Sequence, residues 1–471
     1  MTHVTHTVLG IIGLNAVFTG MAKEKPDIIL ITADDMGMTA GCYGDSLSIT
    51  PNLDRLAAEG VLFTDAYVTH ASCSPSRSSI LTGLFPHQNG HVGLSGSKPA
   101  NGEPYRVAAG TPTLTQLLKN GGYYTGILGK LHVSPGDMFP FDSYPWRETL
   151  LKPELTRDVR KVATCTGDFI KQAGNKPFFL YVNYFDPHFS GNRSDLDNMN
   201  QAEGLPEKPY TAQDVKPFSF LGEAAYMEDV AAYYNAVNRL DAGLGLLFDE
   251  LKKAGRYDNT LIIFISDNGA DFTRAKTTCY EAGVRVPFIV KWPGVSTAGL
   301  KSGDFISAVD IMPTVLDAAG VRCPQTAGVS LRPVLQKKTP ADWRTGIFTE
   351  YTSHANAHFF PRRTMRIGDM KVIQNLDAGR ANPVPRLGVR MNQVTDPVIR
   401  TALETASNPP EWELYDLGKD PDEFKNLAGN SEYHTALKKL QDELLIVRKK
   451  MSDPLLNPAE LKRQREAHGV K

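Results

Sequence analysis

One cysteine stands among serines and a proline in the segment "ASCSPSRSSILTGL", which starts at residue 71. From Cys73 onward this segment predicts a helix, because proline is favoured in a first helical turn and an apolar run follows. The free N–H groups and the positive dipole end of a helix start favour an anion. Arg77, one turn further on, adds a permanent charge suited to sulfate, phosphate or carboxylate. Cys73 therefore stands where an oxyanion would bind, although a cysteine taken alone is more often a small buried residue than a nucleophile.

Two pairs of oxygen-bearing side chains close apolar runs elsewhere in the chain. Asp34 and Asp35 end "DIILITADD", and Asp267 and Asn268 follow "TLIIFIS". Neighbouring side chains of a regular strand point to opposite faces, so both members of a pair can reach one ion only where the strand turns into a loop. A glycine close behind each pair permits such a turn. Carboxylate and amide oxygens from two strand ends predict a site for Ca²⁺ or Mg²⁺.

Further cationic or titratable side chains also follow strand-like runs. Lys130 and His132 stand two apart after "GGYYTGILG", which predicts that they point to the same side. His188 ends the run "PFFLYVNYFDPH", and Lys276 comes shortly after the second metal pair. Together with Arg77 they provide the positive charge and hydrogen bonding that a multiply charged oxyanion requires.

The elements that must position these residues form a repeating pattern. Apolar, β-branched runs that predict strands cover residues 27–35, 177–188, 260–269 and 286–294. Helical patterns lie between them, at 50–60, 111–122 and 233–255. Apolar strands alternating with helices predict an α/β fold with a mostly parallel sheet flanked by helices. Ligands of such sheets bind beyond the carboxyl ends of the strands, where the polar clusters stand.

The pattern changes after about residue 365. Short strands with turns follow, and residues 433–451 predict an amphipathic helix. We therefore predict a catalytic domain over residues 23–365 and a smaller C-terminal α+β subdomain over residues 366–471.

The bulk properties exclude several classes of protein. The 471 residues, 41% of them hydrophobic, can bury a large core. Lys and Arg total 51 against 52 for Asp and Glu, so no net field favours nucleic acid. The five cysteines have neither the spacing of a zinc site nor that of a disulfide framework. The longest apolar run is too short to predict a membrane span.

The N-terminus predicts export. An apolar stretch at residues 8–18 is followed by small residues around Ala22, which is typical of a signal peptide over residues 1–22 and of a periplasmic or secreted protein. The stretch before it carries His3 and His6 but no Lys or Arg, so a buried amphipathic helix is the alternative. An odd number of cysteines in an exported chain leaves one thiol to explain.

Two long signatures in this chain resemble those of the sulfatase family. The first, C-x-P-S-R-x-x-x-L-T-G, runs from Cys73 to Gly83, and the second, G-Y-x-T-x-x-x-G-K-x-H, runs from Gly122 to His132. The resemblance extends over nearly the whole mature chain. It implies an alkaline-phosphatase-like fold and an enzyme that hydrolyses sulfate groups.

The resemblance also implies roles for the residues singled out above. The signature cysteine of this family is oxidised to formylglycine by a formylglycine-generating or sulfatase-maturating enzyme, which would explain the unpaired thiol. The implied Ca²⁺ ligands are Asp34, Asp35, Asp267, Asn268 and the modified residue 73. The implied catalytic residues are Cys73, Arg77, Lys130, His132, His188 and Lys276, and Lys130, His188 and Lys276 are also expected to bind the sulfate.

The chemistry expected from this resemblance depends on an aldehyde hydrate. One of its hydroxyls attacks sulfur, and deprotonation of the other releases sulfate and restores the aldehyde, a second step that serine could not provide. Ca²⁺ and the cationic side chains would stabilise the charge. We expect His188 to protonate the leaving group and His132 to handle the proton of the hydrate.

The substrate is less closely defined. Within the family the chain resembles the N-sulfoglucosamine sulfohydrolases most, but it has Lys276 where they have arginine, and it continues with "YEAGVR" as many O-sulfatases do. A sulfated oligosaccharide or polysaccharide is expected, either heparan-type N-sulfoglucosamine or an O-sulfated sugar. One alternative is a phosphomonoester, phosphodiester or phosphonate hydrolase of the same superfamily. A glycan-binding relative without activity is another, although such a protein would be expected to lose signature residues.

A segment before the change of pattern is a candidate for sugar recognition. "EYTSHANAHFFPRR", at residues 350–363, has poor helical and strand periodicity. If it folds over the strand ends, His354, Arg362 and Arg363 would bind the carboxylate of a uronic acid or the hydroxyls of a sugar. The alternative is a solvated linker.

Overall fold

A computed structural model describes residues 25–145, 157–189, 209–384 and 389–470 of the chain. The predicted signal peptide lies outside the described residues. Within them, no helix combines the length and the apolar composition that a membrane span needs.

A seven-stranded sheet forms the centre of the larger part of the molecule, with the strand order β4-β5-β1-β6-β7-β2-β8. Its strands are β1 (Asp27–Ala33), β2 (Val61–Phe63), β4 (Tyr124–Gly129), β5 (Phe178–Asn183), β6 (Thr260–Ser266), β7 (Phe288–Lys291) and β8 (Leu300–Ser302). Strands β4, β5, β1 and β6 are parallel, with Ile29 of β1 opposite Leu180 of β5 and Ile262 of β6. Among the described strands of this sheet, only β7 runs antiparallel to its neighbours. The predicted mostly parallel sheet is therefore confirmed.

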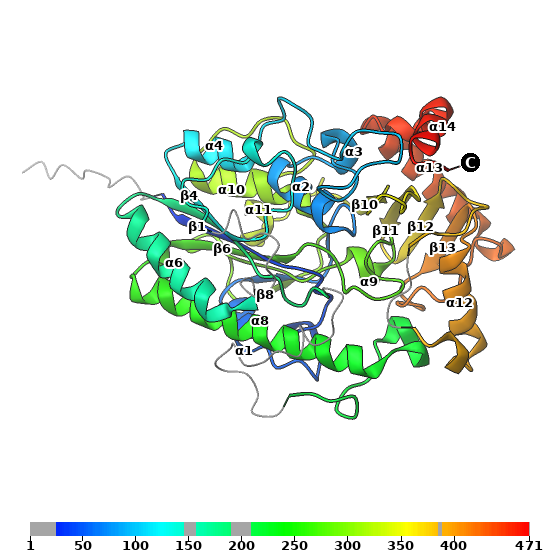
Figure 1. The fold of residues 1–471 in the computed structure, drawn as a ribbon, viewed down its shortest axis with the longest axis horizontal. Helices are drawn as coiled ribbons and strands as arrows, with labels where there is room; N and C mark the ends of the chain where they lie inside the picture. Colours follow the sequence, from blue (N-terminus) through cyan, green and yellow to red (C-terminus); the bar gives the residue numbers. More distant parts are fainter. Residues whose placement is uncertain (1–24, 146–156, 190–208, 385–388, 471) are drawn as a thin grey trace, which may run out of the picture.

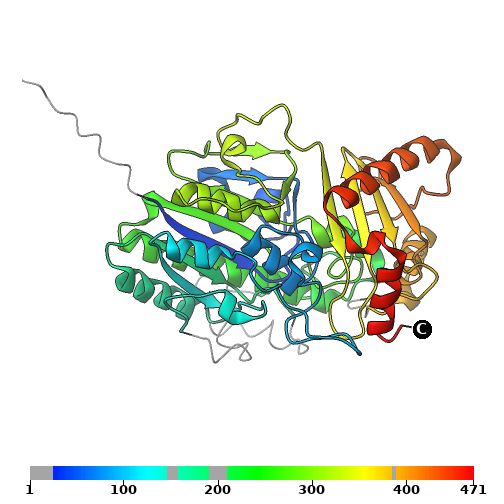
Figure 2. The ribbon, with the colours of Figure 1, turned by 90° about the horizontal axis from the view of Figure 1, so that it is seen from above.

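Helices cover both faces of this sheet because its central strands are apolar on both faces. Ile28 and Leu30 of β1 pack into one core, and Ile29 and Ile31 pack into the other. The first core includes residues of α2 (Cys73–Thr82), α4 (Leu114–Asn120) and α10 (Ile311–Ala319). The second includes residues of α1 (Pro51–Glu59), α6 (Val159–Ala173) and α8 (Met227–Lys253). These two layers lie above and below the sheet in Figure 1, and Figure 2 shows the same arrangement from above.

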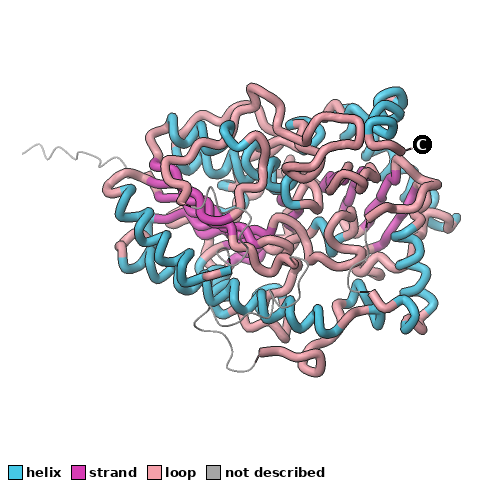
Figure 3. The backbone as a smooth tube through the Cα atoms, in the orientation of Figure 1, coloured by secondary structure: helices cyan, strands magenta, loops and turns pink. Residues whose placement is uncertain are grey.

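The carboxyl ends of the parallel strands point toward the C-terminal part of the molecule. Loops gather there, between the central sheet and the second sheet (Figure 3). They include the segments that follow β1, β4, β5 and β6. The polar residues that close these four strands in the sequence are thus brought to one edge.

The second sheet is antiparallel and four-stranded, in the order β10-β11-β12-β13. Its strands are β10 (Gly346–Tyr351), β11 (Arg362–Ile367), β12 (Met370–Asn375) and β13 (Trp412–Asp416). The helices of this part are α12 (Pro397–Ser407), α13 (His434–Lys450) and α14 (Pro458–Ala467). The structure thus contains the predicted α+β subdomain and the amphipathic helix.

The predicted boundary at residue 365 does not match the structure, because it falls inside β11 and the second sheet already begins with β10. The error has a physical cause. Strand β10 has the sequence GIFTEY, in which apolar and polar residues alternate little, so nothing in it marks the start of a second sheet. Nothing local indicates that it pairs with β11 instead.

The second sheet packs between α13 and the loops of the central domain. Val372 and Leu414 contact Leu440 and Leu444 of α13 on one face. On the other face a separate cluster contains Tyr280 together with residues of the sheet, including Ile373. This packing fixes the second sheet against the segment that follows β6.

Arg362 and Arg363 lie in β11 and are buried, with 3% and 1% of their surface exposed. Nε of Arg363 donates to Asp453 Oδ2 at 2.8 Å, and Nε of Arg362 donates to Asn375 Oδ1 at 3.0 Å. This arrangement contradicts their predicted contact with a sugar, because both guanidinium groups are bound inside the subdomain. The segment 350–363 is not a solvated linker either, since its two ends are strands of the sheet.

Asp453 is expected to stabilise the C-terminal subdomain strongly. Its carboxylate accepts from both Arg363 and Arg448, and it is 3% exposed. Asp453→Ala leaves two buried guanidinium groups without their partner, which should lower the free energy of unfolding by about 3–5 kcal/mol. Chemical denaturation measures this change.

The matched control removes the aspartate of a surface ion pair on α13. Lys438 and Asp442 form an exposed pair at 2.5 Å, so Asp442→Ala should cost less than about 0.5 kcal/mol. Equal losses in the two variants would contradict the structural role of Asp453.

Candidate active site

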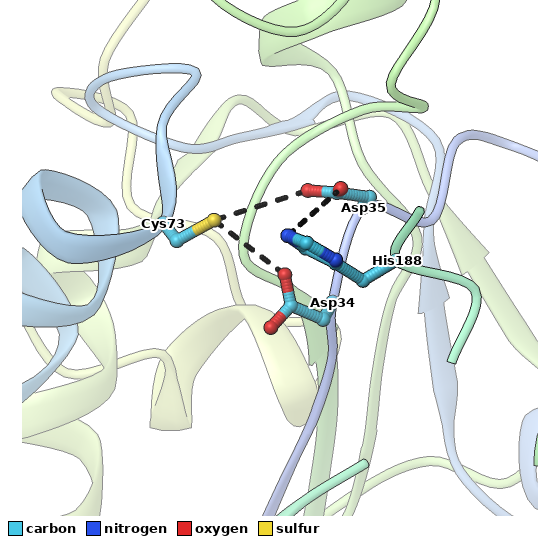
Figure 4. A group of neighbouring side chains, drawn as sticks. All are labelled: Asp34, Asp35, Cys73 and His188. Carbon is cyan, nitrogen blue, oxygen red and sulfur yellow. Dashed lines mark hydrogen bonds and ion pairs between the residues drawn. The ribbon is translucent and has the colours of Figure 1, made fainter. Parts of the chain in front are cut away.

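Cys73 is the first residue of α2 and points into the space between the carboxyl ends of the central strands. It is 1% exposed. Its Sγ lies 3.5 Å from Asp34 Oδ1 and 3.9 Å from Asp35 Oδ1, as Figure 4 shows. The helix start and the end of β1 thus converge on the sulfur atom.

The two aspartates reach the same point because the backbone turns at Asp35. Strand β1 ends at Ala33, and Asp35 has a φ of +67°, in the left-handed region that few residues other than glycine adopt. The turn therefore occurs at the second aspartate itself.

Gly269 was expected to permit a turn, but its φ is not positive. A side chain is excluded there for another reason, because an added Cβ would lie 1.8 Å from the carbonyl oxygen of Ala282. Glycine is needed there for the close approach of two backbone segments.

Asp267 and Asn268 join the same cluster from the end of β6. The N–H of Asp35 donates to Asp267 Oδ1 at 3.1 Å, and Asn268 Nδ2 donates to Asp35 Oδ1 at 2.7 Å. All four side chains are fully buried. The predicted metal-binding residues are thus brought together by the structure.

The residues present fit a hard cation. One ligand atom from each of Asp34, Asp35, Cys73 and His188 lies within 4.8 Å of the others. Asn268 Oδ1 is buried, and no described residue donates to it. A buried carbonyl oxygen without a donor beside several carboxylates is a donor set that Ca²⁺ or Mg²⁺ would complete.

The charges around the cluster affect the two aspartates differently. Burial raises the pKa of Asp34, but Lys130 and other nearby cationic groups outweigh it and hold that pKa well below the ordinary value. Burial raises the pKa of Asp35 to about 8, and Lys276 offsets only part of this effect. Burial also raises the pKa of Asp267, and the charge of Asp34 adds to the shift. A cation bound among these groups would favour their ionised forms.

Two lysines form ion pairs with different aspartates of the cluster. Lys130 Nζ lies 2.7 Å from Asp34 Oδ2, and Lys276 Nζ lies 2.7 Å from Asp35 Oδ2. Burial lowers the pKa of each lysine, but the neighbouring carboxylates raise it by more, so both stay protonated. Both carry positive charge beside residue 73.

Arg77 lies beneath the cluster and is fully buried. Its Nε donates to Asp267 Oδ2 at 2.8 Å, and its Nη2 donates to Asp34 Oδ2 at 3.3 Å. Nη1 donates to Thr32 Oγ1 at 3.1 Å and also contacts Asn183. Arg77 therefore orients the carboxylates. Asn183 was missed in the sequence, although it closes β5 just as Asp34 follows β1.

The Cys73 thiol itself is a poor nucleophile in this position. Burial raises its pKa well above the ordinary value, and the charge of Asp34 raises it further. Only the thiolate of a cysteine reacts readily, and this environment disfavours the thiolate.

His132 and His188 both border the site. Strand β4 ends at Gly129, so the strand alternation predicted for Lys130 and His132 is wrong; His132 has a φ of +52° in the loop that follows. Burial lowers the pKa of both histidines well below the ordinary value, and Lys130 or Lys276 adds to the shift. His188 Nε2 lies 3.8 Å from Asp35 Oδ2. Both imidazoles are neutral in this arrangement.

A buried ion cluster holds the loop that presents His188. Asp186 accepts from Nε of Arg239 at 2.6 Å and also contacts Arg157. Nη2 of Arg157 donates to the carbonyl oxygen of His188 at 2.7 Å. The N–H of Asp34 donates to the carbonyl oxygen of Asp186 at 3.2 Å. These three residues link His188 to the metal ligands. No local pattern in the sequence indicates them, because they come from three separate elements.

Of the three residues of this segment that were predicted to bind sugar, His354 is the one that contacts the residue beside Cys73. It follows β10, and its Nδ1 is hydrogen bonded to Ser72 Oγ at 2.7 Å. Ser72 immediately precedes the signature cysteine. The segment therefore contacts the start of α2 through His354 and turns Arg362 and Arg363 away from it.

Comparison with known proteins agrees with this geometry. A family model described as Sulfatase matches residues 26–321, and one described as N-sulphoglucosamine sulphohydrolase, C-terminal, matches residues 273–379. The chain is 32% identical over 463 residues to N-sulphoglucosamine sulphohydrolase of Homo sapiens, covering 90% of both proteins.

Two solved structures share the fold. One is a complex of a protein with its substrate D-glucosamine-2-N,6-O-disulfate, with a TM-score of 0.66, 23% identity and coverage of 91% of this chain and 99% of that one. The other is a phosphonate monoester hydrolase of Agrobacterium radiobacter, with a TM-score of 0.63, 23% identity and coverage of 90% and 96%. The sulfatase model matches more than half of this chain, and the human relative matches nearly all of it. The chain therefore belongs to the sulfatase family and is an enzyme of the class that hydrolyses sulfuric esters or sulfamides.

Proposed function

We propose that this chain is an exported sulfatase that depends on formylglycine and Ca²⁺ and removes sulfate from a sulfated carbohydrate. The observation that carries the proposal is the position of Cys73, which is buried beside the carboxylates of Asp34 and Asp35. These carboxylates form ion pairs with Lys130 and Lys276. An unmodified thiol would react poorly among these buried carboxylates, because they disfavour the thiolate. An oxygen nucleophile beside a bound cation would be well positioned for attack.

The residues that would hold Ca²⁺ are Asp34, Asp35, Asp267 and Asn268, together with residue 73. When present, the ion supplies charge that polarises the sulfate, and formylglycine in hydrated form supplies one hydroxyl to attack sulfur and another through which sulfate is released. Arg77 keeps the carboxylates in place through its contacts with Asp34 and Asp267.

The side chains around residue 73 would bind the sulfate and move protons. Lys130 and Lys276 hold positive charge where negative charge builds up on the sulfate oxygens. His188 is neutral without substrate, but an anionic group beside it raises the pKa of an imidazole, so it can take up a proton and pass it to the leaving group. His132, on the side of Lys130, is suited to accept the proton of a hydroxyl at residue 73.

The substrate is proposed to be a glycosaminoglycan-type amino sugar or a related O-sulfated sugar. The human relative is named for N-sulphoglucosamine, and the solved structure with bound sugar holds a glucosamine with N- and O-sulfates. The match of residues 273–379 to the model described as N-sulphoglucosamine sulphohydrolase, C-terminal, supports this choice of substrate.

A phosphonate or phosphate ester hydrolase is the second candidate, because a phosphonate monoester hydrolase shares this fold. The family model and the human relative favour sulfate. The described residues that could bind a metal form one cluster, which supports a site for one ion rather than for a pair of zinc ions.

Residue 73 is expected to be formylglycine in active enzyme. A tryptic peptide that contains it should have a lower mass than the cysteine form, and Cys73→Ala should lose activity by more than about a thousandfold while the circular dichroism spectrum and melting temperature stay unchanged. A fully active preparation in which residue 73 carries an unmodified thiol would refute the proposed nucleophile.

Calcium is expected to stabilise the folded chain. The ion offsets the repulsion among three buried carboxylates, so calcium at about 100 times its Kd should add about 2.7 kcal/mol to the free energy of unfolding. The melting temperature should rise with calcium in the native enzyme and fall after chelation.

Asp35→Ala should abolish the response to calcium. Asp137→Ala, which removes an exposed aspartate outside the site, should leave it intact. A melting temperature that does not change with calcium, or that rises only with zinc, would argue against the proposed metal.

Sulfate esters are expected to be better substrates than phosphonate esters with the same aryl leaving group. We expect kcat/KM to favour the sulfate by at least about tenfold, which corresponds to about 1.4 kcal/mol of transition-state discrimination. Release of 4-nitrophenol from 4-nitrophenyl sulfate and from 4-nitrophenyl phenylphosphonate measures this ratio. A preference for the phosphonate would support the second candidate.

A further inference from the structure

A cavity of about 310 Å³ opens beside Lys276. Three segments form its walls: residues 271–278 after β6, His354 and His358 after β10, and the C-terminal residues 381–384 and 406–408. Its volume is at the lower end of the range for small-molecule sites and suits one monosaccharide. Because Lys276 also contacts the Asp35 carboxylate, a ligand in the cavity would adjoin the proposed sulfate position.

The walls of the cavity are held by hydrogen bonds within the protein. Asn382 donates from its backbone N–H to the carbonyl oxygen of Ser407 at 2.7 Å and from Nδ2 to that of Ala406 at 3.0 Å. On the opposite wall the carbonyl oxygen of His354 accepts from the N–H of Leu94 at 2.8 Å. The cavity is thus a formed feature of the junction between the two sheets.

Two stacked imidazoles line one side. The rings of His354 and His358 lie 5.7 Å apart, with 9° between their planes. Burial lowers the pKa of both, and the charge of Lys276 lowers that of His354 further, so both rings are neutral. His354 is fixed through its Nδ1 by Ser72, and among the described residues no partner bonds Nδ1 of His358. A neutral imidazole can both donate to and accept from a hydroxyl group.

Asp271 supplies the anionic group of the cavity. Its side chain is 24% exposed, and its Oδ2 lies 3.8 Å from Lys276 Nζ. A carboxylate accepts hydrogen bonds from hydroxyl or amino groups and repels a carboxylate or a second sulfate. Arg274 also lines the cavity, but both of its terminal nitrogens donate to backbone carbonyl oxygens of the protein.

From this geometry we infer that Asp271, His354 and His358 bind the sugar ring that carries the scissile sulfate. The inference rests on the proposed sulfatase function and deepens it. The site takes a single ring through its free hydroxyl or amino groups. It is not the site for a uronic acid that the sequence of residues 350–363 predicts, because Arg362 and Arg363 are buried elsewhere and a carboxylate at Asp271 repels such an acid.

The test compares substrates that carry the same reacting group with and without a ring. A panel of monosulfated glucosamine, galactosamine and rhamnose is compared with methyl sulfate and 4-nitrophenyl sulfate, and release of inorganic sulfate is measured. For native enzyme we expect kcat/KM for the best sugar to exceed that for methyl sulfate at least tenfold. Asp271→Asn should reduce this ratio about tenfold or more, chiefly through KM, since a hydrogen bond to a charged group contributes on that scale. His358→Ala should reduce it about threefold to tenfold, because a hydrogen bond between neutral groups contributes less.

Asp342→Asn is the matched control, because it removes an exposed carboxylate far from the cavity in the sequence and should leave the ratio unchanged. The inference is overturned if the ratio is unchanged in both cavity variants, or if native enzyme hydrolyses methyl sulfate with the same kcat/KM as the best sugar. The proposed sulfatase activity is not affected by either result. Absence of sulfate release from every compound, aryl sulfate included, would instead reject the proposed function together with this site.

Discussion

The structure depends on a group of charges that are buried together at the carboxyl ends of the central strands. Asp34, Asp35 and Asp267 have no exposed surface, and Arg77 lies beneath them. Burying a charge is costly unless opposite charges and hydrogen bonds compensate it. Lys130 and Lys276 complete the compensation at the side that faces residue 73. A fold that meets this cost must hold each of these side chains at hydrogen-bonding distance from its partners.

The architecture shows how that is achieved. Four parallel strands deliver their terminal residues to one edge, and α2 adds its first turn and Arg77 from the layer above. The ion cluster around Asp186 fixes the loop of His188 from the opposite layer, through Arg239 of α8. The second sheet then closes the remaining side, because its packing against Tyr280 brings His354 to Ser72. The reactive centre and the sugar cavity therefore both lie where the loops of the central sheet meet the second sheet.

Much of this could be predicted from the sequence, for reasons that are local. Runs such as 27–33 and 260–266 are apolar throughout, and that pattern allows few structures other than buried parallel strands. Polar residues directly behind such runs lie at the strand ends, which is why Asp34 and Asp267 could be predicted to converge, whereas Cys73 was indicated by the helix that begins with it. The two signature segments contain Cys73 with Arg77 and Lys130 with His132.

Other features depend on contacts between distant segments, and the sequence gives no local sign of them. Arg362 and Arg363 stand in a run without clear periodicity, and only the pairing of β11 with β10 and β12 buries them. The roles of Asn183, Arg157 and Asp271 depend likewise on partners from other elements. The subdomain boundary was misplaced for the same reason, since burial of β10 does not reveal which sheet it joins.

The central claim is that residue 73 carries an oxygen nucleophile beside a single hard cation. A crystal structure of the native enzyme, with anomalous scattering data recorded to identify the metal, tests both halves of the claim at once. The account predicts one calcium ion bound by oxygen atoms of Asp34, Asp35, Asp267 and Asn268 at about 2.3–2.6 Å, with residue 73 ending in oxygen. A sulfur atom at residue 73 in active crystals, or two zinc ions in the cluster, would contradict it.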